Sequence, residues 1–137
     1  MRPDVVGVLQ LEGSEVQSVY WEPCDPGELP TLCVRFSAAS VKREGVWGHV
    51  KPLTLRLMGA TPTQGSDACL KDAMGAVLEG EVRHAGHVMR ALPLPCQLTD
   101  VVTLSLRFRG GPAWLWKGQS LHTALGADSR FAESYAC

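Results

Sequence analysis

Apolar and polar residues alternate along three stretches of the chain, residues 31–37, 53–58 and 102–108. In each stretch the side chains at every second position are leucine, valine or phenylalanine, and most residues between them are polar. Because successive side chains of a strand point to opposite faces, this period of two is typical of half-buried β-strands. The pattern therefore predicts a chain built mainly from β-strands.

Turn sequences rich in glycine and proline separate these and similar stretches, and they predict three β-hairpins. Proline fixes the backbone angle φ and glycine accepts positive φ, so both residues favour tight turns. The hairpins are expected to pair residues 15–22 with 31–37, residues 80–84 with 87–92, and residues 102–108 with 113–116. A further short strand is predicted over residues 120–124.

One short helix is predicted, over about residues 67–75. Ser66 is a good N-cap, and Asp67 in the first turn interacts favourably with the helix dipole. Gly75 weakens the helix near its end. Apolar residues recur at spacings of three and four, as on one face of a helix, at Leu70, Ala73, Met74 and Val77.

Eight or nine short strands with one helix, in 137 residues, predict a single mainly β domain over residues 1–137. We expect an antiparallel sandwich or a partly closed barrel built from consecutive hairpins. A parallel α/β fold is disfavoured, because each crossover needs a helix that the pattern does not supply. With 45% hydrophobic residues, a chain of this length can form its core without disulfides or a metal.

Composition and charge give little indication of chemistry. The chain has 13 basic and 14 acidic side chains, which gives a formal net charge of −1. No apolar run is long enough to cross a bilayer or to form a secretory signal, so we expect a cytoplasmic protein without membrane contact. The five cysteines are an odd number and include no Cys-x-x-Cys pair, which predicts reduced thiols. We expect no cofactor.

The sequence offers few residues for metal binding or catalysis. His84 and His87 flank a predicted turn at Ala85–Gly86, where two imidazoles could converge on a metal with Cys96 or Glu81. An exposed polar pair is the commoner arrangement at a turn, so we predict no metal site. No Gly-x-Ser-x-Gly elbow, phosphate-binding glycine loop or Walker lysine is present. We therefore predict a protein that is not an enzyme.

Basic and aromatic residues gather in the predicted hairpin over residues 107–117. Trp114 and Trp116 are two positions apart, so they share one face of a strand. Since Leu115 on the opposite face is the more obvious core residue, we expect both indoles to be exposed or half-exposed. The candidate binding residues are Arg107, Arg109, Trp114, Trp116, Lys117 and, from another hairpin, Trp47.

Interleaved cations and aromatic rings also suit single-stranded nucleic acid, because cations hold phosphates while flat rings stack on bases. The 107–117 hairpin has this composition, and so does a second segment. Its residues are Lys42, Arg43, Trp47, His49 and Lys51. The slightly acidic net charge of −1 argues against a dedicated nucleic-acid module, which is usually basic.

Four short segments distributed along most of the chain carry a resemblance to other proteins. They are residues 15–21, 34–39, 92–95 and 131–137. They resemble a family of small, uncharacterised bacterial proteins of the conserved-hypothetical kind. This resemblance implies a compact β-rich domain and supplies no catalytic residues. The first hairpin is also similar to small bacterial immunity proteins, which neutralise toxins by binding them. The His-Asp pair that those proteins carry at the start of the strand is replaced here by Glu-Gly-Ser-Glu at residues 12–15.

Protein binding is the function that these patterns favour. Backbone donors at the edges of the sheet and the aromatic residues of the 107–117 hairpin would supply the contacts. We therefore predict a non-enzymatic bacterial binding or adaptor domain whose partner is another protein. The alternatives are a small-ligand carrier with a cavity inside the barrel, a single-stranded nucleic-acid binder, and a toxin-immunity-like protein.

Overall fold

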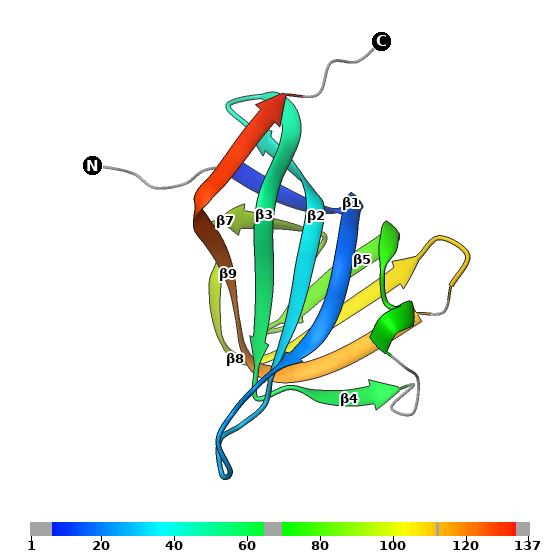
Figure 1. Cartoon of the computed structure of the whole chain (residues 1–137), viewed down its shortest axis with the longest axis vertical. Coiled ribbons are helices and arrows are strands. Elements are labelled where there is room, and N and C mark those ends of the chain that lie inside the picture. The colour runs from blue at the N-terminus through cyan, green and yellow to red at the C-terminus, as the bar shows by residue number, and fades with distance from the viewer. Residues whose placement is uncertain (1–6, 65–69, 112, 134–137) are drawn as a thin grey trace.

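The computed structural model of the protein describes residues 7–64, 70–111 and 113–133. These residues form nine β-strands and one short 3-10 turn (Figure 1). In chain order the elements are β1 (Gly7–Glu22), β2 (Thr31–Arg43), β3 (Val46–Met58), β4 (Thr61–Gln64), η1 (Leu70–Asp72), β5 (Gly75–His84), β6 (His87–Met89), β7 (Ala91–Leu94), β8 (Gln97–Phe108) and β9 (Ala113–Glu133).

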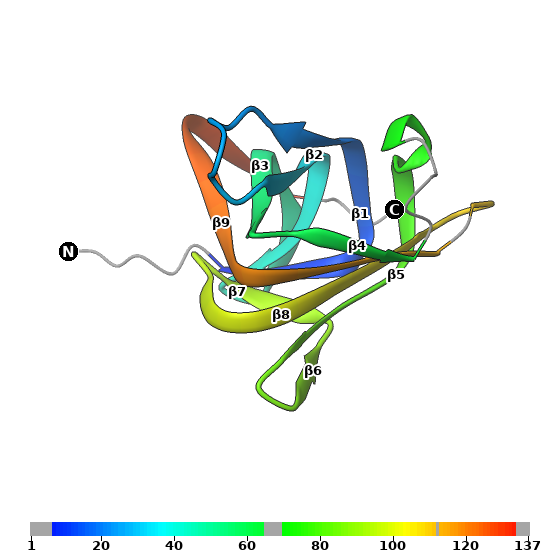
Figure 2. The ribbon, with the colours of Figure 1, turned by 90° about the horizontal axis from the view of Figure 1, so that it is seen from below.

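Six of the strands close into a barrel. Their order around it is β1, β2, β3, β9, β8, β5 and again β1, and every pair is antiparallel. The short strands β4, β6 and β7 pair with β9, β5 and β1. Figure 2 shows the strands curving around a common interior. The mainly β class and the antiparallel barrel are confirmed, but the ring of pairs is complete, so the barrel is closed rather than partly closed, and the alternative of a sandwich is wrong.

The first and third predicted hairpins are present, and the second is shorter than predicted, because Val82–His84 pair with His87–Met89 whereas Ala91 and Leu92 pair with β1. The strand pairs closest to their turns are Glu22 with Thr31, His84 with His87, and Arg107 with Ala113. Gly86 and Gly110 take φ values of 80° and 73° in two of the turns, as tight turns require. The short strand predicted over residues 120–124 is instead the middle of β9, which runs from Ala113 to Glu133.

The helix predicted over residues 67–75 is not formed. In the described part of that segment only Leu70–Asp72 are helical, as one 3-10 turn, and residues 67–69 lie outside the described residues. Gly75, at a φ of 108°, begins β5, so Val77 belongs to a strand and not to a helical stripe. No helix in the described ranges is long and apolar enough to cross a membrane.

Side chains fill the interior of the barrel. Trp116, Phe36 and leucines of several strands are fully buried there. Two glycines face this interior at points where a larger residue does not fit. A Cβ at Gly118 would lie 2.6 Å from atoms of the Leu57 side chain, and one at Gly80 would lie 2.8 Å from a side-chain atom of β1. The core is therefore packed closely enough that a single added methyl group forces its neighbours to move.

β1 turns a corner between Gln10 and Glu15, where its register with β2 shifts. Gly13 within the corner takes a φ of 90°. The fully buried Ser14 hydroxyl accepts a hydrogen bond from the Ser40 backbone N–H at 2.8 Å and donates one to the Gln10 carbonyl at 2.7 Å. One side chain thus satisfies two backbone groups that a bulge would leave unpaired.

Replacing Ser14 with alanine should lower the free energy of unfolding by about 1–3 kcal/mol, because the Ser40 N–H loses its acceptor. Urea denaturation followed by tryptophan fluorescence measures the change. Ser18→Ala is the matched control, since Ser18 lies on the same strand and its hydroxyl has no hydrogen bond among the described residues. Its effect should stay below about 0.5 kcal/mol. Equal stability of Ser14→Ala and the wild type would contradict the role of this hydroxyl.

Gly118→Ala should lower the free energy of unfolding by about 1–3 kcal/mol, because the new methyl group overpacks the core against Leu57. Gly111→Ala serves as the control, since its Cβ would meet no atom closer than 3.9 Å. The control should differ from the wild type by less than about 0.5 kcal/mol in the same urea titration. If Gly118→Ala is as stable as the wild type, the interior has free space beside Leu57.

Candidate functional site

The two tryptophans that were expected at the surface are buried. Trp114 and Trp116 are 3% and 1% exposed, and their rings stack with centroids 5.7 Å apart. They pair with Leu106 and Leu104 of β8, which are also fully buried. Leu115, expected in the core, lies on the opposite face of β9 and is half-buried. The prediction of an exposed aromatic anchor at this hairpin is therefore wrong.

The other predicted binding residues do not share a surface with those indoles. Arg107, Arg109 and Lys117 are exposed around the β8–β9 hairpin, and Arg107 forms an ion pair with a glutamate of β5. Trp47 of β3 is 43% exposed, and Lys42 Nζ lies 5.8 Å from its ring centroid. In the sheet, β9 separates β3 from β8. Binding of a partner by these residues stays a prediction, now without the two indoles.

Part of β1 has an open edge. From Ser18 to Glu22, β1 pairs with β2 on one side. On its other side, within the described ranges, β1 pairs with β7 over residues 7–10 and with β5 only at Glu15 and Val16. Every second residue of an antiparallel strand directs both its N–H and its C=O to the same side. Backbone groups on the far side of Ser18–Glu22 therefore have no partner strand among the described residues.

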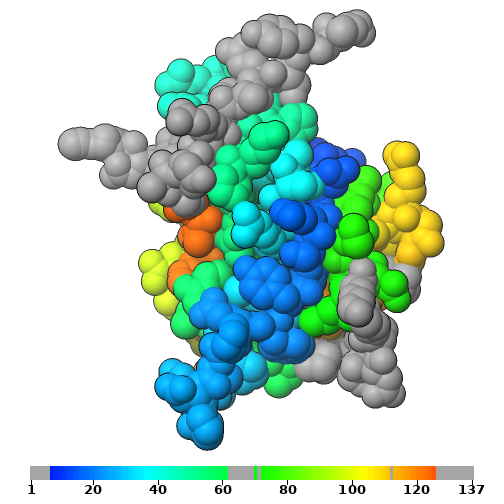
Figure 3. Space-filling view, viewed as in Figure 1, coloured from blue at the N-terminus to red at the C-terminus, as the bar shows by residue number. Residues whose placement is uncertain are grey.

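An apolar groove of about 450 Å³ lies along this open edge. Val19, Tyr20 and Trp21 line it from β1, and Leu70 and Met74 line it from the segment before β5. Tyr20 and Trp21 are each 39% exposed and Met74 is 53% exposed. Figure 3 shows β1 in blue with the green segment that begins β5 beside it. These five residues are termed the β1 groove, and with the open edge they form the candidate site.

None of the groove residues is among the predicted binding residues. The sequence feature that could have indicated the groove is the aromatic pair Tyr20–Trp21, which lies one residue before the turn at Pro23–Gly27. Alternation places this pair in a strand, as the structure has it. Whether a strand edge is open depends on its pairing with distant segments, and local alternation carries no information about that.

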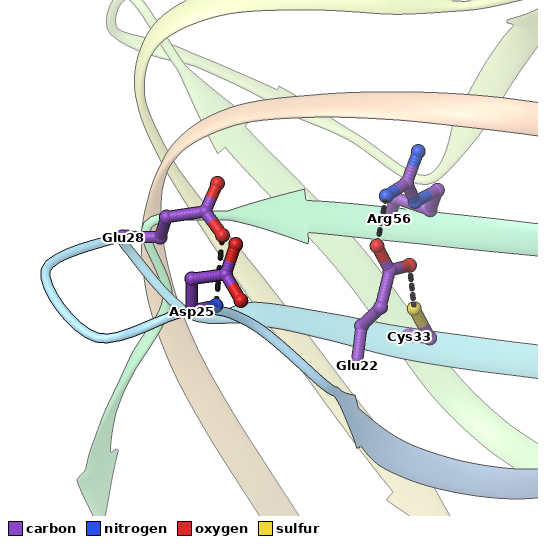
Figure 4. A network of polar contacts seen from close by, with 5 residues as sticks. All are labelled: Glu22, Asp25, Glu28, Cys33 and Arg56. Carbon is purple, nitrogen blue, oxygen red and sulfur yellow. Dashed lines mark hydrogen bonds and ion pairs between the residues drawn. The ribbon is translucent and has the colours of Figure 1, made fainter.

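A polar network anchors the end of β1 next to the groove (Figure 4). Glu22 accepts hydrogen bonds from Arg56 Nη2 at 2.6 Å and from the Cys33 thiol at 3.5 Å, so one carboxylate joins β1 to β2 and β3. In the following loop, the Asp25 N–H donates to the Glu28 carboxylate at 2.8 Å. The Arg56 and Glu22 side chains are 30% and 40% exposed, so their ion pair contributes at most about 1 kcal/mol. The network orients the strand end more than it stabilises the fold.

The two buried thiols, Cys33 and Cys96, are not activated as nucleophiles. Burial raises the pKa of the Cys33 thiol, and its hydrogen bond to Glu22 raises this pKa further. Burial also raises the pKa of Cys96, and the pKa of Tyr20 is raised first by burial and then by Cys33. A thiol with a raised pKa stays protonated at neutral pH, whereas the thiolate is the nucleophile. These groups are suited to packing and hydrogen bonding.

The hairpin histidines do not assemble a metal centre. His84 and His87 are paired across the β5–β6 turn. His84 Nε2 lies 2.6 Å from the Thr99 carbonyl oxygen, so this nitrogen already has a partner. Among the residues described, no group of three or more His, Cys, Asp or Glu side chains is placed to hold a metal ion.

Comparison with known proteins adds no relative. No protein-family model, no curated protein and no solved structure matches this chain. The two resemblances drawn from the sequence therefore stay predictions, and the function is argued from the geometry of the site.

Iodoacetamide should label Cys24 rapidly in the folded protein while Cys33 and Cys96 remain unmodified. Cys24 is exposed, whereas the other two thiols are buried and have raised pKa values. Timed labelling at neutral pH followed by peptide mass spectrometry measures each rate. In urea-unfolded protein, the control, all three should react at similar rates. If folded Cys33 reacts as fast as Cys24, the burial and the raised pKa of its thiol are both contradicted.

Proposed function

We propose that this protein is a non-enzymatic binding domain that takes up an extended peptide segment of another protein along the open edge of β1. The observation that carries the proposal is the coincidence of the open edge, Ser18–Glu22, with the β1 groove. The backbone of the peptide pairs with the edge, and its side chains enter the groove. Binding by strand addition of this kind uses main-chain hydrogen bonds for affinity and side-chain pockets for specificity.

The lining of the groove defines the chemistry of the peptide. The residues that line it are uncharged, and Trp21 and Met74 offer exposed apolar surface. Because alternate residues of a strand point to the same side, the groove fits a peptide with apolar side chains at every second position. Aromatic residues and methionine are enriched in protein interfaces, which supports a protein partner. Gln17 and the Tyr20 hydroxyl add polar groups that can orient the peptide.

The packed interior favours peptide binding over the carriage of a small ligand. A carrier needs a cavity inside the barrel, lined by apolar side chains. Here the interior positions are occupied by leucines and by the stacked Trp114 and Trp116, and there is no room for a Cβ at Gly80 or Gly118. The protonated thiols and the absence of a metal cluster in the described residues likewise provide no support for catalysis.

Linear peptides selected from a random display library on the wild-type protein should bind the Trp21→Ala variant at least about tenfold more weakly. Trp21 is 39% exposed, so its truncation removes contact surface without emptying the core. Fluorescence polarisation of the labelled synthetic peptides measures the Kd. Leu78→Ala is the matched control, because Leu78 of β5 is 41% exposed but lies outside the groove. Its affinity for the peptides should equal that of the wild type.

Amide hydrogen exchange on the same complexes separates strand addition from nonspecific apolar adhesion. Bound peptide should slow exchange at every second amide of Ser18–Glu22, the amides directed to the open edge. Peptides that bind Trp21→Ala and Leu78→Ala equally well, or that protect no amide of this segment, would refute the proposal. Sedimentation of the protein alone gives a further check, since a dimer that buries the groove would assign the site to a second copy of the chain.

A further inference from the structure

The outer face of the β2–β3 hairpin is basic. Residues 31–58, which contain both strands, carry five basic side chains and one acidic side chain. Val41 of β2 and Val50 of β3 are buried in the interior. Their neighbours Lys42 and Lys51 therefore lie on the outer face, and both are exposed. This local excess of positive charge exists although the whole chain has a net charge of −1.

A hollow of about 450 Å³ opens on this face, where the pairing of β2 with β3 skips residues 37–38 and 51–52 while its register stays the same. The cations Arg35 and Lys51 line it together with Ser37 and Gln17. Both cations are exposed, and neither forms an ion pair within the described ranges. A carboxylate near the hollow, that of Glu15, accepts a hydrogen bond from the Ser37 hydroxyl at 2.8 Å. Two unpaired cations beside one hollow suit a phosphate group.

An exposed aromatic ring lies on the same strand as Lys51. Trp47 is 43% exposed and precedes Lys51 by four residues of β3, a distance of about 13 Å at the rise of an extended strand. Lys42 is in register with Trp47 and holds its Nζ 5.8 Å from the ring centroid. The face thus combines a ring that can stack on a base with cations that can hold phosphates on both sides of it.

We propose that the outer face of the β2–β3 hairpin binds single-stranded nucleic acid, with a backbone phosphate between Arg35 and Lys51 and a base stacked on Trp47. The exposed indole favours a single strand over a duplex, because the bases of a duplex are already stacked on one another. The residues that bind here differ from those of the peptide site, since none of these three lines the β1 groove, although Gln17 borders both the hollow and the groove.

The salt dependence of binding tests the two cations. Fluorescence anisotropy with a labelled oligothymidylate of roughly 12 nucleotides gives the affinity between about 50 and 200 mM salt. In the Arg35→Ala, Lys51→Ala double variant the slope of log K against log salt should be shallower by about 0.7, the value for one lost phosphate contact with a single strand. The double variant Arg109→Ala, Lys117→Ala removes two exposed cations elsewhere and should keep the wild-type slope.

Stacking is tested by Trp47→Ala, which should weaken binding at least about tenfold while leaving the salt slope unchanged. Trp21→Ala, which truncates an indole of similar exposure in the β1 groove, should bind the oligonucleotide like the wild type. Melting temperatures confirm that each variant is folded. Binding that is unaffected by Trp47→Ala, equal affinity for a duplex or polyphosphate, or a slope that responds only to Arg109 and Lys117 would overturn the proposal.

Discussion

A short contact between β1 and β5 is the constraint on which the barrel depends. In the described residues only Glu15 and Val16 of β1 pair with β5, at Ala76 and Gly75, while the other joints of the ring are longer. The corner held by Ser14 immediately precedes this contact. Beyond the contact β1 continues beside β2 alone, so its far edge opens. Closure of the barrel and the open edge of β1 therefore have a common origin.

Turn chemistry allowed the three hairpins to be predicted, because each joins neighbouring segments of the chain. The ring could not be predicted in the same way, since the pair Glu15 and Ala76 joins segments far apart in sequence. The apolar residues whose spacing suggested one helix do not lie in one element, since Leu70 belongs to η1 and Val77 to β5. Ala73 follows the 3-10 turn and Val77 lies in β5, and Gly75 with its positive φ begins that strand. Spacing alone does not distinguish these arrangements.

The placement of the tryptophans shows a second limit of alternation. Alternation establishes that Trp114 and Trp116 share a face, but it does not establish which face is inside. Their partners across the sheet, Leu106 and Leu104, point into the barrel. Because residues paired across two strands point to the same face, the two indoles point into the barrel as well. The aromatic surface of the candidate site consequently lies on β1, a strand whose edge only tertiary pairing could reveal.

The open edge of β1 also differs from other edges of this fold in how it is protected. β4 and β7 contain Pro62 and Pro93, which cannot donate a hydrogen bond to a further strand, and β6 has only three residues. β5 carries Glu79 and Glu81 where it pairs with β8 alone, and charges on an edge disfavour the addition of a strand. Ser18–Glu22 contains no proline and presents two aromatic rings. Because exposed apolar edges promote aggregation, native proteins protect them, and the absence of these devices at Ser18–Glu22 is consistent with the partner segment that we propose there.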